Sequence, residues 1–122
     1  MSGADVGRAL WAAIERRDWA AVEALLDPAL VVHWPQSGER FDRAGYLRVN
    51  REYPGDWHVR VVQALDAGEQ VVTEVEVDLD GRTDRAVSFL HLCAGRVIAL
   101  RELWAEPFAA PAWRRGWSLP PT

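Results

Sequence analysis

A strict alternation of apolar and polar residues in the second half of the chain constrains the fold more than any other sequence feature. From Val71 to Leu79 every second residue is Val, Thr or Leu, and three of the four residues between them are acidic. A period of two is that of a β-strand with one buried face. Segments 59–65, 86–93 and 97–106 also alternate, and Asp-Ala-Gly, Asp-Gly and Ala-Gly joints separate the four segments. The sequence therefore predicts an antiparallel meander of four strands linked by tight turns.

The opening of the chain follows a helical period instead. Apolar residues at helical spacing predict one helix over about residues 4–16, with Asp5 as its N-cap. A shorter second helix is expected to begin after an Asp18 cap, and Pro28 is expected to close it.

The segment between these helices and the meander predicts a strand, a turn and a third helix. A strand over residues 30–34 should end at Pro35, and residues 36–39 supply a turn. Asp42 is expected to cap the helix, which Pro54 and Gly55 stop. Helices followed by a curled meander indicate an α+β fold. We expect a cone-shaped α+β barrel, with three N-terminal helices packed on a strongly curved, mainly antiparallel sheet around a central pocket.

The chain is interpreted as one domain with a short tail. Residues 1–106 hold all the predicted elements, whereas residues 107–122 are rich in Pro and Trp and too short to fold alone. We expect Trp113 and Trp117 to pin this tail onto the domain or onto a partner subunit. A lid over the pocket is an alternative role for it.

Charge and composition exclude several classes of function. The net charge is −4, and the 14 basic residues, all arginine, are scattered rather than gathered on one segment, which argues against nucleic acid as a partner. No apolar run approaches a membrane span, and the first residues lack the features of a signal peptide, so a cytoplasmic location is expected. One cysteine and three histidines at unrelated spacings predict no disulfide, no metal site and no cofactor.

Three segments resemble the nuclear-transport-factor-two-like superfamily, and in particular its SnoaL-like branch. They are LWAAIERRDWAAVEALL, VVHWPQSGERFDRAGYL and SFLHLCAGRVIALRELWAEP, and the resemblance extends over nearly the whole chain. It implies the cone fold, a pocket for a small hydrophobic molecule, and a homodimer formed through the exposed face of the sheet. The superfamily contains isomerases, cyclases, dehydratases, epoxide hydrolases and non-catalytic binders, so the fold alone does not select a function.

The ketosteroid isomerase reaction of this superfamily does not fit the sequence. It needs a Tyr, a base Asp and a protonated Asp. The resemblance places Leu10, Trp34 and Ser88 at these three positions, although Pro35 matches the proline that follows the base. We therefore expect a different reaction.

The epoxide hydrolases of the superfamily match at one position of three. Their Arg-x-Asp pair on a middle strand corresponds to Val75 and Val77, which cannot activate water, whereas their last-strand carboxylate has a counterpart in Glu102. The SnoaL-like cyclases also use an acidic residue toward the end of the sheet. Glu102 is compatible with that role.

Glu102 is accordingly the predicted catalytic residue. Strand alternation places it on the same side as Leu100 and Trp104, and the resemblance implies that this side faces the cavity. A carboxyl group walled by Trp and Leu would be desolvated and its pKa raised, which suits an acid–base role. The alternatives are an ion pair with one of the arginines and exposure to solvent.

The other residues expected to contact a ligand come from both halves of the chain. They are Trp34, Tyr46, Asn50, Tyr53, Ser88, Leu100 and Trp104. Trp34 and Trp104 would form walls, Asn50 could bind a ligand carbonyl, and Ser88 could donate to an oxyanion. His33 is expected at the surface, and the face that His91 occupies stays open.

These observations favour a cofactor-free isomerase, cyclase or hydrolase. Its substrate would be a small, mainly apolar, oxygenated molecule, with Glu102 as acid and base. Two alternatives remain at this stage: a binding module that performs no chemistry, and a dimeric scaffold with a filled core.

Overall fold

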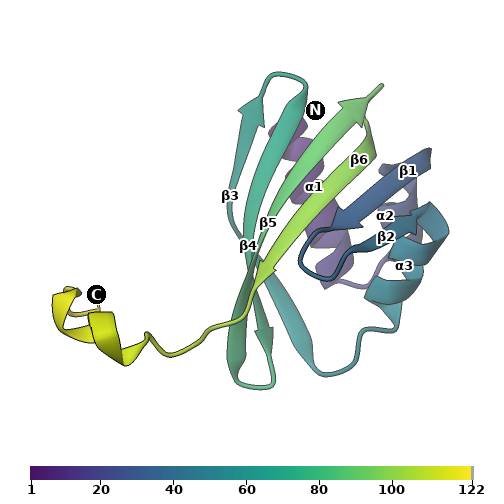
Figure 1. Ribbon diagram of the computed structural model, residues 1–122. Helices are drawn as coiled ribbons and strands as arrows, with labels where there is room; N and C mark the ends of the chain where they lie inside the picture. Colours follow the sequence, from purple (N-terminus) through teal and green to yellow (C-terminus); the bar gives the residue numbers. More distant parts are fainter. Residues whose placement is uncertain (122) are drawn as a thin grey trace.

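The computed structural model describes residues 1–121, and Figure 1 shows its element order. The N-terminal half contains α1 (Gly3–Glu15), α2 (Trp19–Ala24), β1 (Leu26–Trp34), β2 (Glu39–Asp42) and α3 (Arg43–Arg51). The second half contains β3 (Trp57–Ala67), β4 (Gln70–Leu79), β5 (Arg82–Cys93) and β6 (Arg96–Ala105), followed by the 3₁₀ helix η1 (Ala112–Trp117). The α+β class and the four-stranded meander are confirmed.

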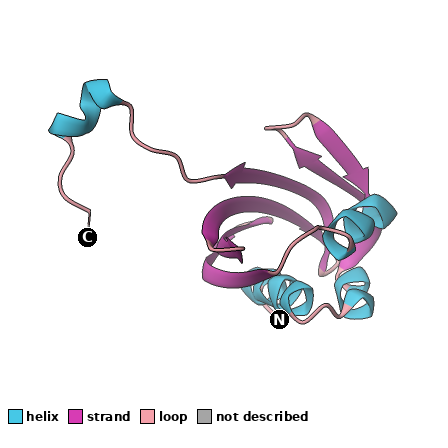
Figure 2. Ribbon diagram, turned by 90° about the horizontal axis from the view of Figure 1, so that it is seen from below, coloured by secondary structure: helices cyan, strands magenta, loops and turns pink. Residues whose placement is uncertain are grey.

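The six strands form one curved sheet in the order β2-β1-β6-β5-β4-β3. All neighbouring pairs are antiparallel except β1 and β6, which run parallel. Figure 2 shows the long strands curling over the helices, with the sheet left open rather than closed into a barrel. The strongly curved, mainly antiparallel sheet that we predicted is confirmed, and its concave face is the one that the helices cover.

The core lies between α1 and this concave face. On β4 the predicted alternation holds, since Val71, Thr73 and Val75 are buried while their neighbours toward the outer face are partly exposed. Trp11 of α1 donates its indole N–H to Thr73 Oγ1 at 2.9 Å. Gly7 lets the helix come close to β4, because a Cβ atom there would lie 2.9 Å from Thr73 Cγ2.

Tight turns link the strands as expected. Asp80 and Gly81 between β4 and β5, and Ala94 and Gly95 between β5 and β6, all have positive φ. Two consecutive residues with positive φ give the turn whose twist matches that of paired strands.

Three local predictions were wrong. Ser2, rather than Asp5, caps α1: Asp5 is the N3 member of a capping box in which each side chain accepts the other residue's backbone N–H. Pro28 does not end α2, because α2 ends at Ala24 and β1 begins at Leu26. The proline lies within β1, where the pairing of β1 with β6 is irregular between Leu26 and Val31. The short edge strand β2 was missed, because its sequence ERFD has no apolar alternation and its pairing with β1 makes it a strand.

No helix among residues 1–121 is long and apolar enough to cross a membrane. After β6 the chain leaves the body as an extended arm that ends in η1 (Figure 1).

Candidate active site

The Glu102 carboxyl group is buried at the centre of a network of hydrogen bonds. Its side chain points from β6 toward the interior, and the residue is 1% exposed. Oε1 accepts the indole N–H of Trp34 at 3.0 Å, and Oε2 accepts the hydroxyls of Ser88 at 2.9 Å and Tyr46 at 3.2 Å. The register of β5 against β6 places Ser88 directly opposite Glu102. The fold thus joins four of the predicted site residues in one network.

No arginine among the described residues pairs with this carboxyl group. Burial raises the pKa of Glu102, and the hydrogen bonds from Trp34, Ser88 and Tyr46 oppose that rise in part. Burial also raises the pKa of the Tyr46 hydroxyl well above its ordinary value, with a further contribution from the charge of Glu102. All three donors are neutral groups and supply no positive charge, so burial outweighs their effect and the net shift of the Glu102 pKa is upward.

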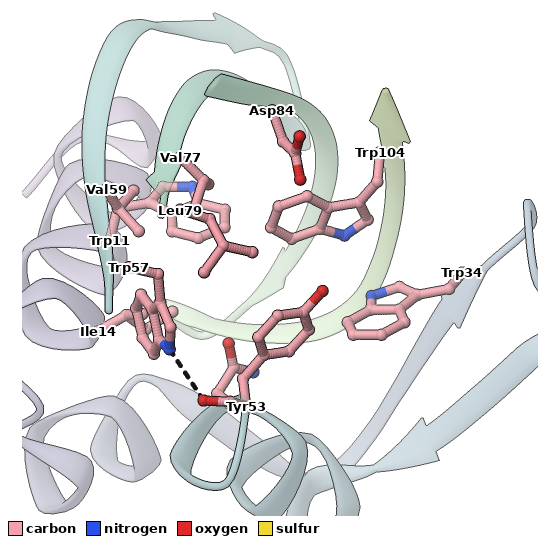
Figure 3. Close-up of a pocket in the computed structure, with 11 residues that line it drawn as sticks. Trp11, Ile14, Trp34, Tyr53, Trp57, Val59, Val77, Leu79, Asp84 and Trp104 are labelled. Atoms are coloured by element: carbon pink, nitrogen blue, oxygen red, sulfur yellow. Dashed lines mark hydrogen bonds between the residues drawn. The ribbon is translucent and has the colours of Figure 1, made fainter. Parts of the chain in front are cut away.

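An aromatic cavity adjoins this network (Figure 3). It is lined by Trp11, Ile14, Trp34, Asn50, Tyr53, Trp57, Val59, Val77, Leu79, Asp84 and Trp104. The cavity leaves about 30 Å³ for the centres of water-sized molecules, which is room for a few waters. A larger ligand must displace a wall, and Tyr53, which is 44% exposed, is the least enclosed of the aromatic residues there.

Trp104 presents an unused hydrogen-bond donor at this cavity. Its indole nitrogen is buried and has no partner among the described residues. The other cavity indoles, Trp11, Trp34 and Trp57, donate to Thr73 Oγ1, Glu102 Oε1 and the Tyr53 carbonyl. In Figure 3 the nitrogen of Trp104 lies on the side of its ring that faces Trp34. A buried donor without an acceptor is costly, so a ligand oxygen or a water bound there would stabilise it.

A surface pocket with acidic groups adjoins the cavity, and we call it the mouth. The mouth is lined by Trp34, Gln36, Ser37, Glu39, Tyr53, Asp84, Trp104 and Glu106, four of which also line the cavity. Asp84 is 6% exposed and accepts two hydrogen bonds from the Arg82 guanidinium, at 2.8 and 3.0 Å. The same guanidinium lies 3.6 Å from Glu106. Asp84 was not among the site residues predicted from the sequence, although its inward position two residues before Ala86 and four before Ser88 could have indicated it.

The predicted site residues differ in whether they line the cavity. Asn50 and Tyr53 line the cavity, and Asn50 also donates its side-chain N–H to the Tyr46 carbonyl at 2.8 Å. Tyr46, Ser88 and Glu102 lie outside the lining, and Trp34 stands between the Glu102 carboxyl and the cavity.

Leu100 points inward but is buried in the hydrophobic core and does not line the cavity. His33 and His91 line a groove on the outer face of the sheet, the face opposite the helices. Within residues 1–121 no three His, Cys, Asp or Glu side chains are grouped in a way that could hold a metal ion.

Comparisons with known proteins agree with this fold. The family described as "SnoaL-like domain" matches residues 7–100. A crystal structure of a proposed ketosteroid isomerase from Kribbella flavida is 30% identical, with a TM-score of 0.88 over 97% of this chain and 88% of that chain. An NTF-2 like protein of unknown function from Burkholderia xenovorans is 27% identical, with a TM-score of 0.81 over 97% of this chain and 94% of its own.

A proposed polyketide cyclase from Streptomyces antibioticus shares the fold at 18% identity. Its TM-score is 0.76 over 85% of this chain and 92% of that chain. No curated protein matches this chain.

Proposed function

The chain belongs to the SnoaL-like family of the nuclear-transport-factor-two-like superfamily, and on this premise we propose that it is a cofactor-independent enzyme. Its substrate is a small, mainly apolar molecule that carries a carbonyl or epoxide oxygen. Glu102 is the acid–base group, and the reaction is an isomerisation, a ring closure or a hydrolysis.

The observation that carries this proposal is a buried carboxyl group with no arginine paired to it among residues 1–121. Burying an ionisable group among neutral donors destabilises the folded state, and a neutral side chain that accepts the same hydrogen bonds would avoid that cost. Groups with such perturbed pKa values are concentrated in active sites. A raised pKa also brings Glu102 closer to neutral pH, where a carboxyl group can both accept and return a proton.

The cavity next to Glu102 supplies the remaining parts of the proposed reaction. The apolar part of the substrate packs against the indoles, and its oxygen accepts the free N–H of Trp104. When a ligand enters, the Trp34 indole turns aside, its bond to Oε1 breaks, and that oxygen faces the ligand. Oε1 then takes a proton from the carbon beside the carbonyl and returns it to another atom, or activates a water that opens an epoxide.

A second candidate is a binding protein that performs no chemistry. The same geometry favours it in one respect: Glu102 is covered and does not line the cavity. In that case the carboxyl group only orients Trp34, Tyr46 and Ser88.

Two simple probes separate these candidates. Cyclohexanone reports acid–base chemistry through exchange of its α-hydrogens in D₂O, followed by NMR, and cyclohexene oxide reports hydrolysis to the diol. We expect activity with at least one probe, and a loss of about 100-fold or more in Glu102→Gln. The matched control is Glu69→Gln, in the exposed turn between β3 and β4, which should keep full activity.

Binding is measured separately from turnover. Either probe should raise the melting temperature of the protein and of Glu102→Gln, because a ligand that binds only the folded state stabilises it. Binding without turnover in the unmodified protein would establish the second candidate. Equal activity in Glu102→Gln would remove Glu102 from the mechanism.

A further inference from the structure

The arm that follows β6, residues 107–121, presents large apolar side chains to solvent. Figures 1 and 2 show it running away from the body toward η1. The large apolar side chains exposed on it are those of Phe108 (80%), Trp113 (68%), Trp117 (78%) and Leu119 (89%). A protein that remains a monomer rarely keeps such a group of apolar residues uncovered, so this surface fits an interface.

The arm is nevertheless ordered by its own contacts. The Trp113 and Trp117 rings meet edge to face with their centroids 5.7 Å apart. Arg115 donates from Nε to the Ala110 carbonyl at 2.6 Å, and Ser118 donates from its hydroxyl to the Arg115 carbonyl at 3.1 Å. Among the described residues, the side-chain hydrogen bonds of the arm are all internal. The aromatic pair is therefore a preformed surface, which lowers the entropic cost of docking.

Two prolines favour a straight path away from the body. Pro107 and Pro111 favour an extended backbone in the residues before them, and Pro111 itself has φ −58° and ψ 145°. Glu106, which directly precedes the first proline, borders the mouth of the cavity in its own chain. The arm thus starts beside its own mouth and is directed away from it.

Part of the arm is also a feature of similar crystal structures. The alignments that extend over 97% of this chain cannot reach that share without including arm residues, because the body ends at Ala105. Arm residues thus have counterparts in both aligned structures.

We propose that the arm of one copy docks over the cavity mouth of a second copy of this chain. Residues 107–122 contain Arg114 and Arg115 and no acidic residue. The mouth contains three carboxylates, from Glu39, Asp84 and Glu106, against one adjacent arginine. Opposite charges of this kind orient two surfaces as they meet.

The outer groove of the sheet is the competing apolar surface, and its charge argues against it. Its basic residues include Arg40 and Arg101, with His33 and His91 beside them, and it contains no carboxylate among the described residues. The basic arm would be repelled there. At the mouth, by contrast, its tryptophans meet the partly exposed rings of Tyr53 and Trp34. Each cavity is then closed by the other copy.

Disulfide trapping between two single-cysteine chains tests this arrangement. Both chains carry Cys93→Ser, which removes the exposed native thiol. One adds Ala112→Cys in the arm, and the other adds Ser37→Cys at the mouth. Mild oxidation of the full-length mixture should give a covalent heterodimer on a non-reducing gel. A chain with Val62→Cys, exposed on β3 away from the mouth, replaces the Ser37→Cys chain as the matched control and should cross-link poorly.

Two further variants separate docking from chance collision. Arg114→Glu with Arg115→Glu should slow cross-linking about tenfold, and Glu39→Arg on the mouth chain should restore much of the rate. Three results would overturn the proposal. The first is the absence of a heterodimer, and the second is faster cross-linking with Val62→Cys than with Ser37→Cys. The third concerns a chain that carries both Ala112→Cys and Ser37→Cys: it would cross-link only within itself, with the arm as a lid on its own cavity.

Discussion

At the residue scale, Glu102 shows how one side chain can tie several elements together. Its carboxyl group on β6 accepts hydrogen bonds from β1, α3 and β5. These bonds satisfy the carboxyl oxygens but supply no positive charge. The free energy of unfolding should therefore depend on the protonation of this one group.

The pH dependence of stability follows from the direction of the pKa shift. The folded state binds the Glu102 proton more tightly than the unfolded chain, where the pKa is near its ordinary value of 4.5. Stability should thus fall as the pH rises from 4.5 through the raised pKa, and this contribution should be constant at higher pH. Glu102→Gln cannot titrate. Measured by thermal unfolding across this range, the stability of Glu102→Gln should improve relative to the unmodified protein as the pH increases. A difference that does not vary with pH would contradict the raised pKa.

Truncating the same network should be more damaging than neutralising it. Glu102→Leu leaves the Trp34, Tyr46 and Ser88 donors without an acceptor, at about 1–3 kcal/mol for each donor that stays buried and unpaired. Glu102→Gln keeps an acceptor for Trp34 and an amide that can donate to a hydroxyl. Urea unfolding should rank Glu102→Leu as the less stable variant at neutral pH. The reverse order would show that the hydrogen bonds contribute little.

Trp104 allows a separate test of ligand recognition. Trp104→Phe removes the unpaired N–H and keeps an aromatic ring, so we expect the melting temperature to change little or to rise. The affinity for cyclohexanone, followed by tryptophan fluorescence, should fall about tenfold because one hydrogen bond is lost. Unchanged affinity would mean that the ketone oxygen binds elsewhere.

At the element scale, α1 packs against β4 on the concave face of the sheet. The bond from the Trp11 indole to Thr73 Oγ1 fixes the helix, and both groups are buried. Thr73→Val keeps the shape and leaves the indole N–H unpaired, so it should cost about 1–3 kcal/mol in the free energy of unfolding. Thr83→Val serves as the control, since the Thr83 hydroxyl contacts Asp78 at an exposed site, and should change stability by no more than about 0.5 kcal/mol. Equal effects of the two variants would rule out a special role for this bond.

At the scale of the whole molecule, we propose that the outer face of the sheet forms a homodimer. Val31, Leu65 and Leu103 are exposed on strands, and Phe89 lines the outer groove. Leu103→Asp should weaken the association of copies in sedimentation equilibrium, because a buried charge without a partner opposes association. Glu69→Lys, in the exposed turn, should leave the dimer intact. A monomeric unmodified protein would refute this interface.

The sheet interface and the arm are independent contacts. Removing the first by Leu103→Asp tests whether the arm alone holds two copies together. Charge reversal at Arg114 and Arg115 tests whether the sheet interface alone holds two copies together. The two contacts would act together if either change alone only weakened association.

The sequence by itself determined most of the elements and the buried faces of the meander strands. Alternation at period two predicts which side of a strand is buried, so the burial of Val71, Thr73 and Val75 followed from local order alone. For Glu102, alternation gave only the side that it shares with Leu100 and Trp104, and the family resemblance implied that this side faces inward. The turns were equally local, since consecutive residues with positive φ need only suitable neighbours.

Tertiary structure alone decided what each inward side chain meets. Contacts such as Ser88 with Glu102 and Trp34 with Glu102 depend on strand register and on the distance between elements far apart in the chain. Asp84 lines the cavity whereas Leu100 is buried in the core, although both side chains point inward. Sequence periodicity encodes the direction of a side chain but not the tertiary packing that decides which inward positions border the cavity.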